Sequence, residues 1–300
     1  MTVLKDYAKK YETVRLERRN GILQVTLHTN GGPVRWGPIV QSELVDAFTQ
    51  IGADRENRIV ILVGSGKEFS GPRAEPGKSF YREISHNITA DLLDRTHWNA
   101  KRVMTRMLDI EVPMIGVVNG PAMRHSELPL MCDIVIASDD ATFEDTAHFD
   151  IASQVPGDGI NMVYTMLLGL NRARYFMLMG QVLSAQEAKD LGLVSEIHKR
   201  DQLLGRAWEI AEKLAKKNDL LLRYTRVVLT EPLRKWMEES VMYHLGMEAL
   251  AKLDKEDVHS DDEELKPKRK SQPQPSGRTA RKTARVKVRK EAKKPSGARG

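Results

Sequence analysis

The sequence predicts an α/β fold with a helical C-terminal region, and three features support this prediction. Short β-rich segments alternate with helical segments over the first half of the chain, as in an α/β core. Two β-rich segments are apolar at nearly every position, which is typical of strands buried on both faces of a parallel sheet. From about residue 160, apolar residues recur at helical spacing. The 300 residues, 41% of them hydrophobic, are enough to bury a sizeable core.

The first element is a predicted β-hairpin. Residues 15–27 contain two short β-rich pieces around the pair Asn20-Gly21, which is a strong signal for a two-residue turn. The next strand is predicted over residues 58–63 and ends at glycines 64 and 66. Between them we expect a helix over residues 41–51, with a cap at Ser42 and an apolar face made of Leu44, Val45, Phe48 and Ile51.

The remaining elements lead from this core into helices. We expect a helix around residues 90–108, a buried strand over 112–120, a short helix from Leu128, and a strand over 134–137. Six further helices are predicted over residues 162–168, 173–179, 185–191, 206–216, 220–228 and 232–253. We therefore divide the chain into an α/β core (1–200), a C-terminal helical region (201–260) and a disordered basic tail (261–300).

Charge is distributed unevenly along the chain. The net charge is +6, but residues 266–300 hold 14 Lys and Arg against the single acid Glu291, which leaves residues 1–265 with a net charge of −7. The acidic body is not expected to bind a polyanion. The tail has too little apolar surface to fold alone, and we interpret it as solvated. Binding of nucleic acid through the tail is the alternative, although the tail has no aromatic side chain to stack on bases.

The sequence also argues against several classes of protein. No apolar run approaches the roughly 20 residues that span a bilayer, and the first residues lack the basic-then-apolar order of a secretory signal, so we expect a cytoplasmic protein. The lone Cys132 permits no internal disulfide and no cysteine-rich zinc site. His-x-x-x-His, a Gly-rich phosphate loop and Gly-x-Ser-x-Gly are all missing from the sequence, so we predict no metal and no cofactor.

Two neighbouring segments resemble a known family. Residues 112–122, Val-Pro-Met-Ile-Gly-Val-Val-Asn-Gly-Pro-Ala, and residues 132–138, Cys-Asp-Ile-Val-Ile-Ala-Ser, are similar to the central signature of the crotonase (enoyl-CoA hydratase/isomerase) superfamily. Further similar segments follow in the family's order at residues 141–143, 155–157, 183–188 and 192–194. The resemblance covers roughly residues 12–253 and implies a spiral of strand–strand–helix repeats. It also implies a helical C-terminal region that builds homotrimers or dimers of trimers.

The chain departs from that family where its members hold the thioester oxygen. That oxygen normally lies between two backbone N–H groups, one of which follows the Gly-Pro-Ala motif in a run of glycines. Here the run is replaced by Met123-Arg124-His125-Ser126, which should spoil the close backbone approach that glycine permits. At the other position Pro72 has no N–H at all. These departures make chemistry on CoA thioesters doubtful.

Within the superfamily, the chain is more similar to the β-diketone hydrolase branch, that of 6-oxocamphor hydrolase, which works by a retro-Claisen cleavage without CoA. The stretch from His148 to Asp158 is one residue longer here. The resemblance implies that His125, His148, Asp158 and Trp36 are active-site residues, with Glu248 as a further substrate-binding candidate. The similar segments fall at residues 10–18, 28–36, 54–57, 125–129, 148–159, 174–176 and 248–251.

The chemistry assigns a task to four of these residues. Hydrolysis adds water to one carbonyl carbon and then releases the second carbonyl as an enolate. We assign His148 as the general base that activates water and Asp158 as the carboxylate that orients it. His125 and the Trp36 indole N–H are assigned to stabilise the oxyanion and enolate. The His148 imidazolium then returns its proton to the enolate carbon.

Each assignment has a plainer alternative. His125 is alternatively a surface histidine, Asp158 a residue that caps a turn, and Trp36 a cover for the core. Glu248 is alternatively structural or at a subunit contact.

The expected substrate is a small cyclic or bicyclic diketone. Aromatic side chains that are candidates to line its pocket are Phe80, Phe149, Tyr81 and Trp98, although most such residues belong to ordinary cores.

Two other functions compete with diketone hydrolysis. The first is a CoA-dependent hydratase or isomerase in which Glu127 acts as acid and base. Its weakness is that the second glutamate expected in a hydratase is replaced by Ala147-His148. The second is a crotonase scaffold without activity that serves a partner or nucleic acid through the basic tail.

Overall fold

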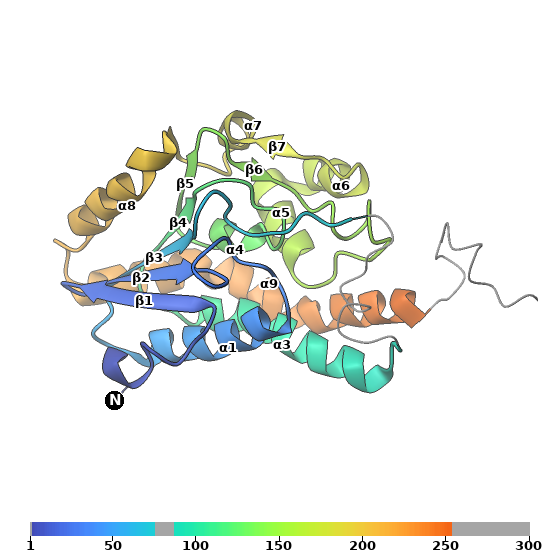
Figure 1. Cartoon of the computed structure of the whole chain (residues 1–300), viewed down its shortest axis with the longest axis horizontal. Coiled ribbons are helices and arrows are strands. Elements are labelled where there is room, and N and C mark those ends of the chain that lie inside the picture. The colour runs from blue at the N-terminus through green and yellow to red at the C-terminus, as the bar shows by residue number, and fades with distance from the viewer. Residues whose placement is uncertain (1, 76–86, 254–300) are drawn as a thin grey trace, which may run out of the picture. The chain divides into compact units, whose positions relative to one another are not determined.

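One mixed sheet forms the centre of the computed structural model, which describes residues 2–75 and 87–253 (Figure 1). Its strand order is β1-β2-β3-β4-β5-β8; β1 and β2 are antiparallel, and all other neighbours are parallel. The strands are β1 (Val14–Arg19), β2 (Ile22–Leu27), β3 (Ile59–Gly64), β4 (Met114–Val118), β5 (Ile134–Ser138) and β8 (Glu196–His198). A second small sheet pairs β6 (Thr142–Phe143) with β7 (Leu183–Ser184).

The predicted hairpin is confirmed. Arg19 of β1 pairs with Ile22 of β2, and the two residues between them, Asn20 and Gly21, have φ angles of 53° and 77°. Positive φ at both central residues is what a tight turn between twisted strands requires, and Asn-Gly adopts it at low cost. The hairpin therefore forms one edge of the central sheet, and the parallel strands follow it in the strand order.

Helices cover the central sheet on both faces, which explains its continuous apolar strands. In β3, Ile59, Ile61 and Val63 belong to the apolar cluster under α8 (Arg200–Leu214), whereas Val60 and Leu62 belong to the cluster on the opposite face. That opposite face packs against α1 (Pro38–Ala53), α3 (Ala90–Leu108) and α9 (Asp219–Leu253) (Figure 1). The α/β fold with a mostly parallel sheet is thus confirmed.

The shorter helices follow the expected order, with small shifts at their ends. They are α4 (Glu127–Leu130), α5 (Ile160–Leu168), α6 (Leu170–Leu178) and α7 (Ala185–Asp190), preceded by a 3₁₀ turn, η1 (Leu4–Asp6). Helix α1 starts earlier than predicted, with Gly37 at its N-cap and Pro38 in its first turn. Ser42 therefore lies inside the helix, where its hydroxyl donates to the Ile39 carbonyl at 3.0 Å.

The predicted break between two C-terminal helices is wrong. Helix α9 runs without interruption from Asp219 to Leu253 and contains Pro232. Proline removes the N–H that would bond the Val228 carbonyl. Val228 is 69% exposed, so water can satisfy that carbonyl and the helix continues. The proline was expected to separate two helices, but at this exposed position it does not end the helix.

A buried ion pair fastens α9 to the sheet. Arg226 is 1% exposed and forms an ion pair with Asp133, which also accepts the Met114 backbone N–H at 2.7 Å. The Arg226 Nε donates to the Ile110 carbonyl at 2.6 Å. One guanidinium therefore connects α9 with the chain entering β4 and with the residue just before β5.

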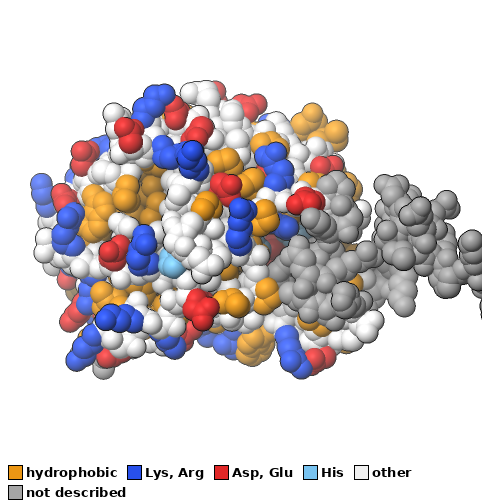
Figure 2. Space-filling view, viewed as in Figure 1, with side chains coloured by type: hydrophobic (Ala, Val, Ile, Leu, Met, Phe, Trp, Pro, Cys, Tyr) orange, Lys and Arg blue, Asp and Glu red, His pale blue; other side chains and the backbone are white. Residues whose placement is uncertain are grey.

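The body carries charges of both signs. On the face seen in Figure 2, acidic and basic side chains alternate, and neither sign gathers over a continuous area. Within residues 2–75 and 87–253, no helix combines the length and apolarity needed to cross a bilayer. The basic tail lies outside the described residues, so its solvated state and the domain boundaries at 200 and 260 stay predictions.

We expect Arg226→Met to lower the free energy of unfolding by roughly 3–5 kcal/mol, because it leaves the Asp133 carboxylate without its buried partner. Urea unfolding followed by circular dichroism measures this change. Lys235→Met is the control, since Lys235 forms an exposed ion pair with Glu231 one turn away and should change the value by less than about 0.5 kcal/mol. Equal effects of the two variants would contradict a structural role for the Arg226 pair.

Candidate active site

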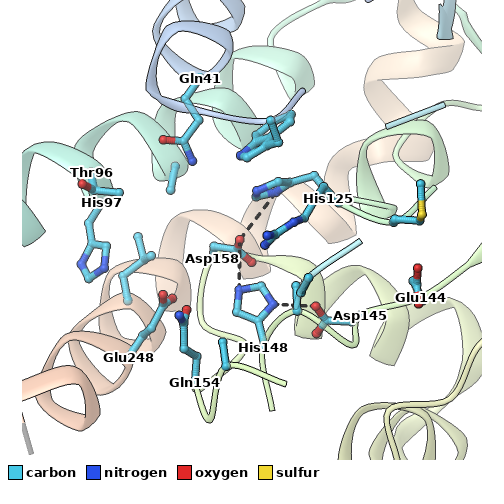
Figure 3. Close-up of a pocket in the computed structure, with 18 residues that line it drawn as sticks. Gln41, Thr96, His97, His125, Glu144, Asp145, His148, Gln154, Asp158 and Glu248 are labelled. Carbon is cyan, nitrogen blue, oxygen red and sulfur yellow. Dashed lines mark hydrogen bonds and ion pairs between the residues drawn. The ribbon is translucent and has the colours of Figure 1, made fainter. Parts of the chain in front are cut away.

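A pocket opens where the loops after β2, β3, β4 and β6 meet α1, α3 and α9 (Figure 3). Its polar lining is concentrated on two sides: a histidine and carboxylate group on the loops, and a set of polar side chains on the helices. The residues that line it are Trp36, Gln41, Ala74, Thr96, His97, Ala100, Met123, Arg124, His125, Glu144, Asp145, Ala147, His148, Ala152, Gln154, Asp158, Leu245 and Glu248.

Backbone pairing holds the loops side by side. The Trp36 N–H donates to the Gly71 carbonyl at 2.8 Å, and the Met123 N–H donates to the Ser70 carbonyl at 2.9 Å. The Ala122 N–H in turn donates to the Thr142 carbonyl at 2.8 Å. These hydrogen bonds therefore hold segments that are far apart in the sequence next to one another, and they fix the positions of the side chains that line the pocket.

Two backbone N–H groups near the expected oxyanion hole are already bonded within the protein. The Gly71 N–H donates to the Val34 carbonyl at 3.1 Å, and the next residue, Pro72, has no N–H. The Arg124 N–H faces the Ser70 hydroxyl oxygen at 3.4 Å. His125 occupies the left-handed region with φ of 50°, a conformation that favours glycine. The backbone keeps a glycine-like turn here, while the Gly71 and Arg124 N–H groups are already engaged within the protein.

Asp145 orients His148 through the Nδ1 atom of its ring. Its Nδ1 lies 2.5 Å from Asp145 Oδ1, and Asp145 is 4% exposed. The carboxylate fixes the ring orientation and leaves Nε2 as the nitrogen that is free to exchange a proton. This corrects the predicted dyad, because the residue that orients His148 through its other nitrogen is Asp145, not Asp158.

Asp158 lies between the two histidines of the site. Its Oδ2 is 3.6 Å from His148 Nε2 and 3.6 Å from His125 Nδ1 (Figure 3). Its Oδ1 accepts the Ile160 N–H at 3.3 Å at the start of α5. One oxygen of this carboxylate therefore accepts a backbone N–H at the start of α5, while the other faces the two histidines. The additional residue between His148 and Asp158 does not separate them.

His125 is packed between an acid and an indole. Its Nδ1 lies 2.8 Å from Glu127 Oε1, and its ring centroid is 3.8 Å from that of Trp36 at an interplanar angle of 31°. The Trp36 Nε1 is buried and has no hydrogen-bond partner among the described residues. An unpaired buried donor in a pocket is costly unless a ligand accepts from it.

The helices supply the opposite wall. Gln41 of α1, His97 of α3 and Glu248 of α9 all line the pocket and are less than one-tenth exposed (Figure 3). Glu248 comes close because the turn before α5 lies against α9: a Cβ on Gly157 would be only 2.5 Å from the His244 carbonyl oxygen. Glycine at 157 thus permits the contact that brings Glu248 to the pocket.

The charges of the site shift the pKa values of its members. Burial acts to lower the pKa of His148, but the carboxylates of Asp145 and Asp158 outweigh burial and raise it to about 10. Burial acts to raise the pKa of Asp158, yet the two imidazoles hold it below its ordinary value. Asp158 is therefore an ion at neutral pH, flanked by rings that tend to keep their protons.

Three members of the site could together hold a metal ion. The ligand atoms of His125, Glu127 and Asp158 all lie within 4.8 Å of one another. Carboxylate oxygen and imidazole nitrogen suit several divalent transition metals. Because the His125 nitrogen and the Glu127 oxygen are at hydrogen-bonding distance, a metal would have to displace the proton that they share.

Most of the predicted site residues lie in one pocket, whereas Phe149 and Trp98 of the predicted aromatic lining do not. Trp36, His125, His148, Asp158 and Glu248 all line one pocket.

Phe149 does not line the pocket: it is 48% exposed, and the loop turns it toward solvent. Trp98 is also exposed, and the Arg102 guanidinium stacks on its ring at 3.9 Å. Phe80 and Tyr81 lie outside the described residues. The aromatic lining that the sequence suggested is thus contributed, among the described residues, by Trp36 alone.

Asp145 is the main site residue that the sequence analysis missed. The pattern Asp145-Thr-Ala-His148 contains the signal, because a three-residue spacing brings both side chains to one side of a turn. His97 and Gln41 were also missed. Both come from helices whose approach to the loops depends on tertiary packing, so no local pattern marks them.

Comparison with known proteins agrees with this architecture. The family model for enoyl-CoA hydratase/isomerase matches residues 17–268. A probable peroxisomal enoyl-CoA hydratase of Arabidopsis thaliana is 30% identical over 195 residues, which are 64% of this chain and 68% of the relative.

Solved structures extend the comparison. A β-diketone hydrolase from Anabaena sp. PCC 7120, bound to (S)-3-oxocyclohexyl acetic acid, is 40% identical, with a TM-score of 0.77 over 82% of this chain and 96% of that one. An enoyl-CoA hydratase/isomerase from Mycobacterium paratuberculosis is 22% identical, with a TM-score of 0.73 over 82% and 96%, and shows the shared fold. The chain belongs to the enoyl-CoA hydratase/isomerase, or crotonase, superfamily of enzymes.

Proposed function

We propose that this crotonase hydrolyses a carbon–carbon bond of a cyclic β-diketone. The observation that carries the proposal is a side-chain donor beside backbone donors that are in use: the buried Trp36 indole N–H next to His125 has no partner among the described residues, while the Gly71 and Arg124 N–H groups are already bonded. Such donors suit the charge that develops when a diketone is cleaved without a thioester.

The first step is the addition of water to one carbonyl carbon. His148 takes a proton from the water through Nε2, and Asp145 stabilises the resulting imidazolium from the Nδ1 side. Asp158, 3.6 Å from Nε2, attracts the same positive charge and keeps it near the reacting atoms.

The second step is cleavage. The tetrahedral adduct collapses to a carboxylic acid as the bond to the carbon between the two carbonyls breaks, and the electron pair of that bond becomes an enolate. Trp36 and His125 donate hydrogen bonds to the enolate oxygen. His148 then delivers its proton to the enolate carbon, which restores the neutral ring and gives a keto acid. The protein's own groups carry every proton in this sequence.

The ligand of the Anabaena enzyme supports this choice of substrate class. That ligand is a cyclic ketone with an acetic acid arm. Joining its acid carbon to a ring carbon beside the ketone regenerates a bicyclic β-diketone, so it has the form of a hydrolysis product. At 40% identity over most of both chains, the two proteins are similar enough for this chain to act on a related diketone.

The competing CoA-dependent function lacks its acid–base group. Glu127 is fully buried, forms a hydrogen bond to His125, and does not line the pocket. A glutamate in that position cannot reach a substrate without a rearrangement of the loop. The names of the curated relatives favour hydratase chemistry, and the arrangement of these side chains favours hydrolysis of a diketone.

We expect purified protein to convert a bicyclic 1,3-diketone to a keto acid and to leave crotonyl-CoA unchanged. His148→Ala should lower kcat by roughly 10²- to 10⁴-fold, the usual contribution of a general base. Product formation followed by chromatography measures both results. Turnover of crotonyl-CoA alone would reject the proposal in favour of the hydratase.

Asp145→Asn should shift the pH dependence as well as the rate. Only neutral His148 accepts a proton, and its raised pKa means that kcat/KM rises with pH from neutral into the alkaline range. Removing the Asp145 charge lowers that pKa, so the rising limb moves to lower pH, while kcat falls by roughly 10²- to 10⁴-fold because an amide can donate to Nδ1 and leave the ring proton on Nε2, the wrong tautomer for a base.

The control for this variant is Asp150→Asn. Asp150 is an exposed acid on the same loop and does not line the pocket, so rate and pH profile should match those of the wild type. An unshifted limb in Asp145→Asn would show that Asp145 only supports the loop.

We propose that the protein assembles into trimers or pairs of trimers through its C-terminal helices. Several large apolar side chains on α9 are more than half exposed, which is expensive unless a partner covers them. They are Leu220, Leu221, Tyr224, Val228, Leu229, Met242, Tyr243 and Leu250. Light scattering should give three or six times the chain mass of 33.9 kDa. A monomer across the working concentration range would contradict this proposal.

A further inference from the structure

Two buried glutamines line the pocket in addition to its acids and histidines. Gln41 of α1 is 5% exposed, and Gln154, on the loop before α5, is 7% exposed. Neither side-chain amide forms a hydrogen bond with any residue in the described part of the chain. A buried amide without a protein partner is costly, so each of these side chains is suited to bind an oxygen of a ligand.

The backbone fixes Gln154 next to His148. The Gln154 N–H donates to the His148 carbonyl at 3.0 Å, and the Ala152 N–H donates to the same carbonyl at 3.2 Å. Ser153, between them, has a φ of 49°, in the left-handed region, which closes this turn. The Gln154 side chain therefore enters the pocket beside the His148 ring, as Figure 3 shows.

The addition of water creates a charge for which the groups named so far supply no donor. As His148 removes a proton, the water oxygen bonds to the carbonyl carbon, and the π electron pair moves onto the carbonyl oxygen. Trp36 and His125 bind the other oxygen of the diketone, which later becomes the enolate. The first oxyanion needs a donor near the base, because the base and this donor act on the same carbonyl group.

The other N–H donors of the pocket are less well placed for this task. The Nε of Arg124 already donates to a backbone carbonyl at 3.0 Å. Gln41 and His97 come from helices α1 and α3, which form the wall opposite the loops (Figure 3). Among the described residues that line the pocket, Gln154 is the amide donor that a backbone hydrogen bond holds next to His148.

We propose that Gln154 is a catalytic residue whose side-chain N–H donates to the oxyanion formed when water adds to the first carbonyl. This inference rests on the proposed diketone hydrolysis for the identity of that oxygen. When the adduct collapses, an electron pair of the oxyanion re-forms the carbonyl bond of the acid, and the pair of the broken carbon–carbon bond passes to the enolate. Gln154 exchanges no proton at any step, since an amide is neutral throughout.

Kinetics test the role of Gln154 in the reaction. Gln154→Met removes the donor and keeps the length of the side chain, so kcat and kcat/KM should fall together by about 10²- to 10³-fold. KM should stay nearly unchanged, because the contact strengthens only as the charge develops. The substrate is the bicyclic diketone obtained by closing the acid arm of (3-oxocyclohexyl)acetic acid onto its ring. Gln186→Met is the matched control, since Gln186 is exposed on α7 and bonds Asp190.

Binding of two anions tests the same contact without turnover. The probes are (3-oxocyclohexyl)methylphosphonate, whose tetrahedral group imitates the adduct, and the planar (3-oxocyclohexyl)acetate, both measured by calorimetry with the full-length protein. Gln154→Met should weaken phosphonate binding by about tenfold or more and acetate binding by less than about threefold. Gln154→Glu keeps the shape of the side chain but places a carboxylate beside the anion, so it should weaken phosphonate binding further. Retained acetate binding shows that the pocket of each variant is folded.

The outcomes separate this proposal from the proposed function. Unchanged kcat and unchanged phosphonate binding in both variants would overturn the role of Gln154 and leave diketone hydrolysis standing. An equal loss of binding for the two anions would also overturn it, because Gln154 would then only shape the pocket. Phosphonate binding that depends on Gln154, in a protein that hydrolyses no diketone, would reject the proposed function and leave the oxyanion contact standing.

Discussion

The site depends on one carboxylate shared by two imidazoles. Asp158 Oδ2 lies at the same distance from His125 and His148, and each histidine has a second acid: Asp145 contacts the other ring nitrogen of His148, and Glu127 contacts the same nitrogen of His125. In a buried setting such charges are tolerable only when they compensate one another. The loops, the Gly157 turn and the α9 contact all serve to hold this alternating row of acids and bases together. A change at any member therefore alters the protonation of its neighbours.

Much of the fold followed from local patterns in the sequence. The Asn20-Gly21 hairpin, the apolar β3 and most helices were predictable, because strand pairing and buried faces leave a regular trace in the residues. The continuity of α9 through Pro232 was not predictable, since it depends on how exposed that turn of the helix is. Contacts between side chains on different loops could not be predicted either, because the loops are far apart in the sequence and no residue spacing connects them.

The candidate site shows the same division. The family resemblance brought out His125, His148, Asp158, Trp36 and Glu248, and these residues do converge on one pocket. The pairing between them could not be predicted: Asp145 takes the position expected for Asp158, and Phe149 points to solvent. Resemblance identified the members of the site, but distances were needed to assign which nitrogen faces which oxygen.

The bonded backbone around Gly71 and Arg124 has a wider consequence. A main-chain N–H keeps its proton over the pH range in which proteins are folded and is lost only by substitution to proline, so a site that relies on it has a nearly fixed electrostatic character. Side-chain donors can be exchanged one at a time while the main chain stays where it is. By using the Gly71 and Arg124 N–H groups to hold neighbouring loops together, this crotonase leaves the chemistry of its pocket open to change through single substitutions.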